Sequence, residues 1–182
     1  HANRDVSCTS CHQIHSPKDK VRDKRQQAEV CYTCHKQQRA EANKPSHHPI
    51  PEGKMTCSDC HNAHGSAGQK MLVKDTTNAT CFTCHAEKRG PFLWEHAPVR
   101  DNCLSCHNAH GSNHDKLLNV ARPFMCQQCH GVANGHAPTL YNASQVIGGG
   151  GNPSTRIIGH SCNNCHSQIH GSNHPSGARF QR

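Results

Sequence analysis

The chain has 182 residues and a formal charge of +8, with 14 cysteines and 19 histidines but only four Phe, two Tyr and one Trp. So few large apolar side chains exclude a conventional hydrophobic core, and a chain of this kind is either disordered or held together by a non-protein group. No apolar run approaches the roughly 18 residues of a membrane-spanning helix. The chain begins at His1 without an initiator methionine, so we expect a processed form or a fragment.

Every cysteine belongs to a CxxCH motif, and there are seven copies along the chain. In chain order the cysteine pairs are Cys8 and Cys11, Cys31 and Cys34, Cys57 and Cys60, Cys81 and Cys84, Cys103 and Cys106, Cys126 and Cys129, and Cys162 and Cys165. The histidines that follow them are His12, His35, His61, His85, His107, His130 and His166. CxxCH is the attachment signature of c-type haem. Two thiols three residues apart reach the two vinyl groups on one edge of the porphyrin, and the next residue supplies the proximal imidazole.

A single CxxC pair has other readings, namely a thioredoxin-like redox pair, half of a zinc site or a pair of disulfide partners. None of these requires a histidine directly after every pair. Because the histidine occurs in all seven copies and no cysteine is left over, the sequence predicts seven covalently attached haem c groups.

The remaining histidines supply enough sixth ligands for these irons, whereas three methionines do not. Bis-histidine coordination is therefore expected, and it lacks the methionine ligand that raises a haem potential. Eight of these histidines recur in the repeat, either before a motif or shortly after one: His1, His48, His96 and His136, and His15, His64, His110 and His170.

The stretch CSDCHNAHGS, residues 57 to 66, returns as CLSCHNAHGS, residues 103 to 112. Residues three apart on a helix lie on one face, whereas trans imidazoles approach a porphyrin from opposite faces. We therefore expect His64 to ligate a different haem from the one that His61 holds. Eight candidates for seven irons leave one surplus, either His1 or His170. If His1 is the surplus, it would serve a haem from sequence before residue 1.

The repeat divides the chain into units of two haems at about residues 1–47, 48–95 and 96–135, with a final one-haem half-unit at 136–182. The other histidines, His47, His114, His160 and His174, have no repeat partner, so we expect them at the surface or bonded to haem propionates.

The expected fold class is mainly α with extensive coil and few or no strands, in one elongated domain whose core is supplied by haems. Short helices are predicted at the motifs, with longer helical stretches near 21–44, 80–89 and 115–130, separated by prolines. The sequence GGGGNPS at 148–154 predicts a flexible loop. Without haem the chain is not expected to fold, as with metal-dependent small domains.

The basic charge does not indicate a nucleic-acid partner. A ferric haem with two ionised propionates contributes about −1, so seven haems bring the oxidised protein close to neutrality. There is also no pattern of aromatic residues to stack bases.

Three stretches resemble a known family: MTCSDCHNAHGS (55–66), TCFTCHAEKRGPFLWEHAPVRDNCLSCHNAHGS (80–112) and SCNNCHSQIHGSNHPSG (161–177). They are similar to the periplasmic decahaem subunits of porin–cytochrome conduits of the Mtr/Pio/DmsE type. This resemblance implies a c-type cytochrome of the Gram-negative periplasm, inserted in an outer-membrane porin. It also implies partners, namely a periplasmic electron donor and an outer-surface multihaem cytochrome or terminal reductase. The family has ten haems and this chain has seven motifs, so it matches the C-terminal seven.

The sequence therefore predicts an electron-transfer protein and no enzyme. A first alternative is a multihaem reductase of the nitrite or hydroxylamine type, which needs an iron with an open position. A second is a subunit of an extracellular cytochrome filament, in which a spare histidine would ligate a haem of the next subunit. The direction of electron flow is left open.

Overall fold

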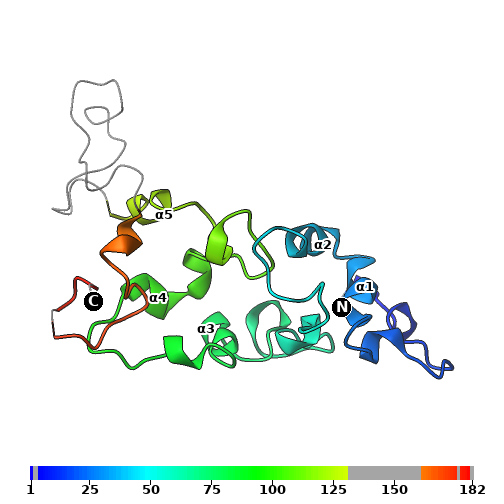
Figure 1. The fold of residues 1–182 in the computed structure, drawn as a ribbon. Coiled ribbons are helices and arrows are strands. Elements are labelled where there is room, and N and C mark those ends of the chain that lie inside the picture. The colour runs from blue at the N-terminus through cyan, green and yellow to red at the C-terminus, as the bar shows by residue number, and fades with distance from the viewer. Residues whose placement is uncertain (2–3, 131–160, 176, 181–182) are drawn as a thin grey trace, which may run out of the picture.

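The computed structural model describes residues 1, 4–130, 161–175 and 177–180. The chain forms an elongated body, with the first 40 residues at one end and the C-terminal residues at the other (Figure 1). Its α-helices are short: α1 at Gln27–Tyr32, α2 at Lys36–Ala42, α3 at Thr77–Cys81, α4 at Ala97–Asp101 and α5 at Phe124–Gln127. Single 3-10 turns lie at Cys8–Ser10, Lys20–Arg22, Cys57–Asp59, Gln69–Met71, Ala86–Lys88, Cys103–Ser105, Asp115–Leu117 and Cys162–Asn164.

The described part of the chain contains no β-strand, only isolated bridges such as Ser46 with Ser112 and Trp94 with Ser172. The prediction of short helices, coil and almost no sheet is therefore confirmed. The three longer helical stretches are broken into pieces: α1, α3 and α5 end inside CxxCH motifs, at Tyr32, Cys81 and Gln127. The predicted loop at 148–154 lies outside the described residues.

Each of the seven motifs forms the same single turn. The backbone N–H of the histidine donates to the carbonyl of the first cysteine, at 2.8 to 3.1 Å in all seven copies. A bond between residues four apart places the first cysteine and the histidine on one face of the turn. The motif therefore presents its thiols and its imidazole on one side, toward the same space.

Side chains join successive motifs to one another. The amide of Asn78, in α3, donates to the carbonyls of Val99 and Arg100 in α4, and its oxygen accepts the N–H of Cys103. The fourth motif is thereby fixed against the start of the fifth. Thr76 caps α3 by accepting the N–H of Ala79.

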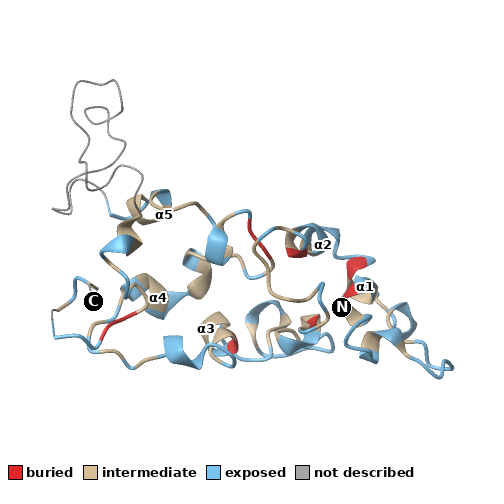
Figure 2. Ribbon diagram, viewed as in Figure 1, coloured by how far each residue is buried: buried red, intermediate tan, exposed pale blue. Residues whose placement is uncertain are grey.

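Very little of the described chain is buried (Figure 2). The buried apolar residues are Ala28, Tyr32 and Ala42, which form one small cluster near α1 and α2. A cluster of this size cannot offset the conformational entropy of ordering the chain, which costs about 1–2 kcal/mol per residue. None of the helices described here is long and apolar enough to cross a membrane.

Candidate functional site

Histidine rings face one another in pairs along the described chain. Six pairs have ring centroids 5.9 to 6.3 Å apart: His1 with His35, His12 with His64, His48 with His85, His61 with His110, His96 with His130, and His107 with His170. Each pair consists of the histidine of one CxxCH and one of the predicted sixth ligands. His61 and His64 belong to different pairs, as the helix geometry predicted.

The pairs follow a rule that the sequence did not reveal. His1, His48 and His96 each face the second CxxCH histidine of their own repeat, namely His35, His85 and His130. His64, His110 and His170 each face the first CxxCH histidine of the preceding repeat, namely His12, His61 and His107. The pairs of the first kind therefore close each repeat, and those of the second kind join one repeat to the next.

The separation of the rings fits a haem iron between them. An imidazole nitrogen binds a first-row metal such as zinc at about 2.0–2.1 Å, and the ring centre lies roughly 1 Å behind that nitrogen. Two imidazoles on opposite sides of one metal are therefore about 6 Å apart between centres. All six observed pairs have this spacing, and one ring of each pair follows directly on the two cysteines that would attach the porphyrin.

The sixth-ligand histidines within a repeat are oriented by the next repeat. The Nδ1–H groups of His1, His48 and His96 donate to the carbonyls of Ala63, Ala109 and Ile169, at 3.0, 2.8 and 3.1 Å. Each of these carbonyls belongs to the residue just before a histidine of the other class, namely His64, His110 or His170. A bond at Nδ1 leaves Nε2 as the nitrogen that can bind a metal. The two kinds of sixth ligand are therefore positioned together.

The first CxxCH histidine of each repeat is also oriented through Nδ1. His61 donates to the carbonyl of Lys70 at 3.0 Å, and His107 donates to the carbonyl of Lys116 at 2.8 Å. Both lysines have positive φ, 52° and 59°. This left-handed conformation costs a non-glycine residue about 1–2 kcal/mol, and here it turns the carbonyl toward the ring. His12 differs, because it bonds to the carboxylate of Asp19 at 2.7 Å.

Burial favours the neutral form of three sixth-ligand histidines. It lowers the pKa of His96, His110 and His170, because charged imidazolium is disfavoured away from water. Neutral imidazole is the form that binds a metal. Glu41 lies 3.3 Å from Nδ1 of His110 and partly opposes the effect of burial there.

The thiols place the motifs in a single file. A hydrogen bond between Cys31 and Cys57 lowers the pKa of the Cys57 thiol and raises that of Cys31. Four further cysteines have a raised pKa, caused first by burial and then by a thiol of the next motif. The neighbouring thiol is Cys31 for Cys11, Cys81 for Cys60, Cys103 for Cys81 and Cys129 for Cys106. Burial and Cys162 likewise raise the pKa of Cys126. Each motif therefore lies beside the next one in the sequence, from the first to the seventh.

The other ways of using these cysteines do not match the geometry. All 14 are free thiols. Within the described ranges no three His, Cys, Asp or Glu side chains converge on one point, whereas structural zinc needs four ligands. The two cysteines and the histidine of a motif instead lie on one short turn, as attachment to one edge of a large flat group requires.

The two alternatives for the surplus histidine can be compared with the ring pairs. His1 and His170, the two alternatives, both face a CxxCH histidine. Among the predicted ligands that the structure describes, His15 is the one that lies opposite no imidazole. Counting repeats could not distinguish them, because His15 has the same place after its motif as His64. The predicted ligand for the seventh motif, His136, lies outside the described residues, as does His160. The proximal histidine of that motif, His166, is described, and its Nδ1–H donates to the carbonyl of Arg179.

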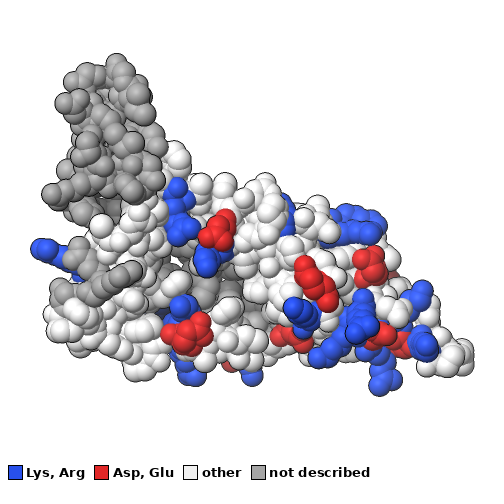
Figure 3. Space-filling model, in the orientation of Figure 1, with Lys and Arg blue, Asp and Glu red and all other residues white. Residues whose placement is uncertain are grey.

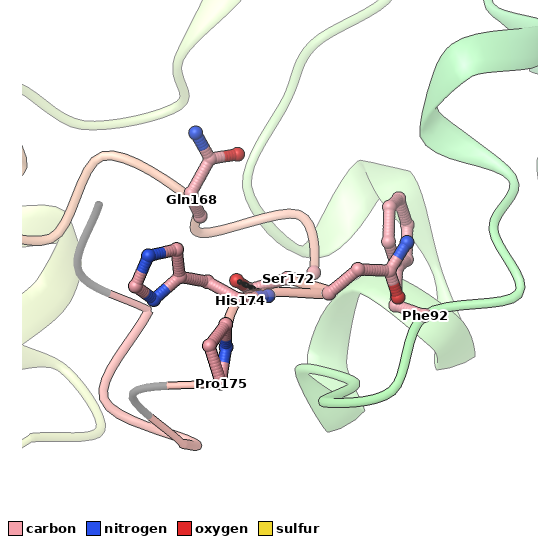
Figure 4. A pocket seen from close by; sticks show the side chains of 7 residues that line it. Phe92, Gln168, Ser172, His174 and Pro175 are labelled. Carbon is pink, nitrogen blue, oxygen red and sulfur yellow. Dashed lines mark hydrogen bonds between the residues drawn. The ribbon is translucent and has the colours of Figure 1, made fainter.

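A pocket of about 560 Å³ lies beside His170, lined by Phe92 and by Gln168 and residues 171–175. Phe92 lies at one end of it, and His174 and Pro175 lie toward the other (Figure 4). The same two segments are paired by reciprocal backbone bonds between Trp94 and Ser172, at 2.9 and 3.0 Å. The only titratable side chain among the lining residues is His174, so the pocket holds no pair of acid and base groups. We interpret it as part of the contact that holds His170 opposite His107.

The face seen in Figure 3 carries its lysines and arginines mainly at the end formed by the first 40 residues, with acidic side chains between them. This mixed charge gives no continuous basic surface for a nucleic acid.

A family described as "Doubled CXXCH motif" matches residues 1–40, 47–90 and 96–135, which is more than half of the chain. The chain belongs to this family. Each matched range contains two CxxCH motifs. The chain is also similar to "Multiheme cytochrome MtrA" of Shewanella baltica (strain OS185), with 54% identity over all 182 residues. These residues span 54% of that relative's length, or about half of it.

The sequence reasoning missed the groups that orient the ligands. Lys70 and Lys116 act through backbone carbonyls, which have no signature of their own. The similar stretches QKML, at 69–72, and DKLL, at 115–118, each place a lysine nine residues after a CxxCH histidine and mark the turn. In the first repeat the similar stretch DKVR, at 19–22, places its lysine only eight residues after His12, and this shorter spacing was the available sign that His12 uses a different partner.

Proposed function

We propose that this chain transfers electrons along seven bis-histidine haem c groups and carries out no substrate chemistry. The observation that supports this most directly is the set of six facing histidine pairs, combined with the contact between thiols of successive motifs. Haems attached in this order would be neighbours along the chain, so an electron could pass from each to the next. The proposed ligands of the six pairs are those described above, and His136 is proposed for the iron of His166.

We propose the same context for this protein as the resemblance implied: the Gram-negative periplasm and an outer-membrane porin. The proposed partners are a periplasmic electron donor and an outer-surface multihaem cytochrome or terminal reductase. The support is the identity with a multihaem cytochrome along the whole chain. The elongated shape suits a conductor between two partners, one at each end (Figure 1).

An enzyme reading is less well supported. A reductase needs an iron with an open position, and each of six irons would have an imidazole on both faces. A filament is a second candidate to test, because His15 faces no imidazole in the described chain and would be available to an iron beyond these seven. Electron microscopy of the purified protein distinguishes isolated particles from filaments.

The deciding experiment is mass spectrometry of the purified holoprotein with optical and electron paramagnetic resonance (EPR) spectra of its oxidised form. The proposal predicts a mass increase of seven haems and only low-spin ferric iron. A smaller number of haems contradicts the haem count, and a high-spin signal in the unaltered protein contradicts full bis-histidine ligation and revives the reductase. The rate at which the haems take up electrons is measured separately, by stopped-flow reduction with a small donor.

A further inference from the structure

The hydrogen-bond partner of His12 is different in kind from those of the equivalent histidines. In the second and third repeats, the histidine ring and the backbone N–H of the residue after it donate to the backbone carbonyls of two consecutive residues. Lys70 accepts from Nδ1 of His61, and Met71 accepts the backbone N–H of Asn62 at 2.7 Å. Lys116 and Leu117 receive His107 and Asn108 in the same way.

In the first repeat, one carboxylate replaces both carbonyls. Oδ2 of Asp19 accepts from Nδ1 of His12 at 2.7 Å, and Oδ1 accepts the backbone N–H of Gln13 at 3.3 Å. The geometry around the ring is thus preserved while a neutral acceptor is exchanged for a charged one. The Asp19 side chain is only 16% exposed, so water screens this charge incompletely.

No lysine or arginine of the described chain lies within ion-pair distance of the Asp19 carboxylate, although Lys18 and Lys20 flank it in sequence. Its charge is therefore directed at His12. A charged acceptor makes a stronger hydrogen bond than a carbonyl, and a carboxylate on a ligating histidine raises the basicity of that ligand. A more basic axial ligand and a nearby negative charge both stabilise ferric over ferrous iron, and hydrogen bonding to the ligand is one of the means by which a protein sets a haem potential.

We propose that Asp19 is a positioning residue that tunes the haem held by Cys8, Cys11 and His12, making it harder to reduce than the haem held by Cys103, Cys106 and His107. This inference rests on the proposed function, because it requires haem at both motifs. It assigns the haem at one end of the described array a lower potential, which favours electron flow from that end toward the middle of the array.

A single haem can be followed if its sixth ligand is removed. His64→Ala leaves only the His12 haem five-coordinate, and His170→Ala does the same for the His107 haem, whose proximal ring bonds to a carbonyl. In the reduced holoprotein, the iron–histidine stretching band in the resonance Raman spectrum then reports on the proximal ligand of that haem alone. We expect a higher frequency in His64→Ala than in His170→Ala. We also expect Asp19→Asn, added to His64→Ala, to lower the frequency to the value in His170→Ala.

The potential of the same haem is measured by titrating its high-spin ferric EPR signal. Adding Asp19→Asn to His64→Ala should move the midpoint in the positive direction, and Asp19→Glu should restore it in part. The matched control is Asp23→Asn, which removes an equal charge nearby; Asp23 accepts from the N–H of Arg25 and the amide of Gln26 and contacts no ligand. An equal shift with Asp23→Asn would show that the loss of any nearby negative charge moves the midpoint, and would overturn the proposal.

The proposal is also overturned if Asp19→Asn leaves both the band and the midpoint unchanged while the high-spin signal is present. That result would leave the proposed function intact. Failure of His64→Ala to produce any high-spin haem would instead contradict the assigned ligands, and with them the proposed function on which this inference rests.

Discussion

The rings of His12 and His64 lie 5.9 Å apart between centroids and are within 11° of parallel, although they belong to different repeats. His64 follows His61 by three residues and faces away from it toward the first motif. One short turn therefore contributes a histidine to each of two neighbouring ring pairs, and the two pairs are joined by a single CHNAH segment. The same arrangement recurs at His107 and His110.

His64→Ala should create one high-spin haem, because the iron held by His12 loses its sixth ligand. Electron transfer past that haem should slow, since the change in coordination raises the reorganisation needed at the iron. Oxidised EPR spectra and stopped-flow reduction measure the two effects. His15→Ala is the matched control, because His15 has the same place after its own motif but faces no imidazole in the described chain. It should leave the seven haems of this chain low-spin, and a high-spin signal from His15→Ala would contradict the pairing.

Pairs with nearly parallel rings and pairs with strongly tilted rings should give two kinds of low-spin EPR signal. The rings of His107 and His170 and of His61 and His110 are within 14° and 19° of parallel, whereas those of His1 and His35 are 73° apart. Two parallel rings interact with the same iron dπ orbital and so separate its energy from that of the other dπ orbital. This separation gives a rhombic signal with three resolved g values. Strongly tilted rings leave these orbitals close in energy and give one large g value.

The measurement is EPR of the oxidised protein and of two ligand variants. His48→Ala should remove intensity at large g, because the rings of His48 and His85 are tilted by 54°. His110→Ala should remove rhombic intensity instead. The His47→Ala control, one residue from His48, should change neither signal, since His47 bonds to Glu52 and to the carbonyl of Lys44. If both ligand variants lose the same signal, the ring angles do not set the spectra.

The sequence predicted the parts of this fold that depend on composition and on repeated spacing. The CxxCH turns, the near absence of sheet in the described residues and the placing of His61 and His64 in different ring pairs all follow from residues that recur at fixed intervals. The choice of facing partner did not follow, because it depends on how the repeats pack: the rings of His1 and His170 both face a CxxCH histidine, whereas His15 faces none in the described chain. The orienting carbonyls were also missed, since every residue has one and only the left-handed backbone at Lys70 and Lys116 aims it.

Gly111→Ala should destabilise the protein much more than Gly65→Ala, although both glycines follow a CHNAH segment. Both have positive φ, 154° and 121°, so each substitution carries a backbone penalty of about 1–2 kcal/mol. A Cβ at residue 111 would lie 2.0 Å from the carbonyl oxygen of Glu41, whereas nothing lies within 4 Å of a Cβ at residue 65. Overpacking adds about 1–3 kcal/mol, so Gly111→Ala should cost roughly 3 kcal/mol or more.

Chemical denaturation of the two holoproteins, followed by far-ultraviolet circular dichroism, measures the difference. The clash also bears on ligation, because Glu41 lies beside His110. Gly111→Ala should therefore weaken the ligation of the His61 haem, seen as a high-spin fraction that Gly65→Ala lacks. Equal stability of the two variants would show that the contact between residue 111 and Glu41 is not as close as described.

The chain should not fold without haem. Its described apolar core consists of Ala28, Tyr32 and Ala42, with Ile50 and Cys57 packed against it. Burying one large apolar side chain contributes about 1.5–3 kcal/mol, whereas ordering the backbone costs about 1–2 kcal/mol for every residue. The protein part alone falls short by a wide margin, and the porphyrins proposed between the six facing pairs of rings would supply missing apolar surface. Protein produced in cells that lack the haem-attachment machinery should show a random-coil circular dichroism spectrum, no cooperative thermal transition and rapid proteolysis, with the holoprotein as the control. A cooperative transition in the haem-free chain would mean that polypeptide contacts alone stabilise this fold.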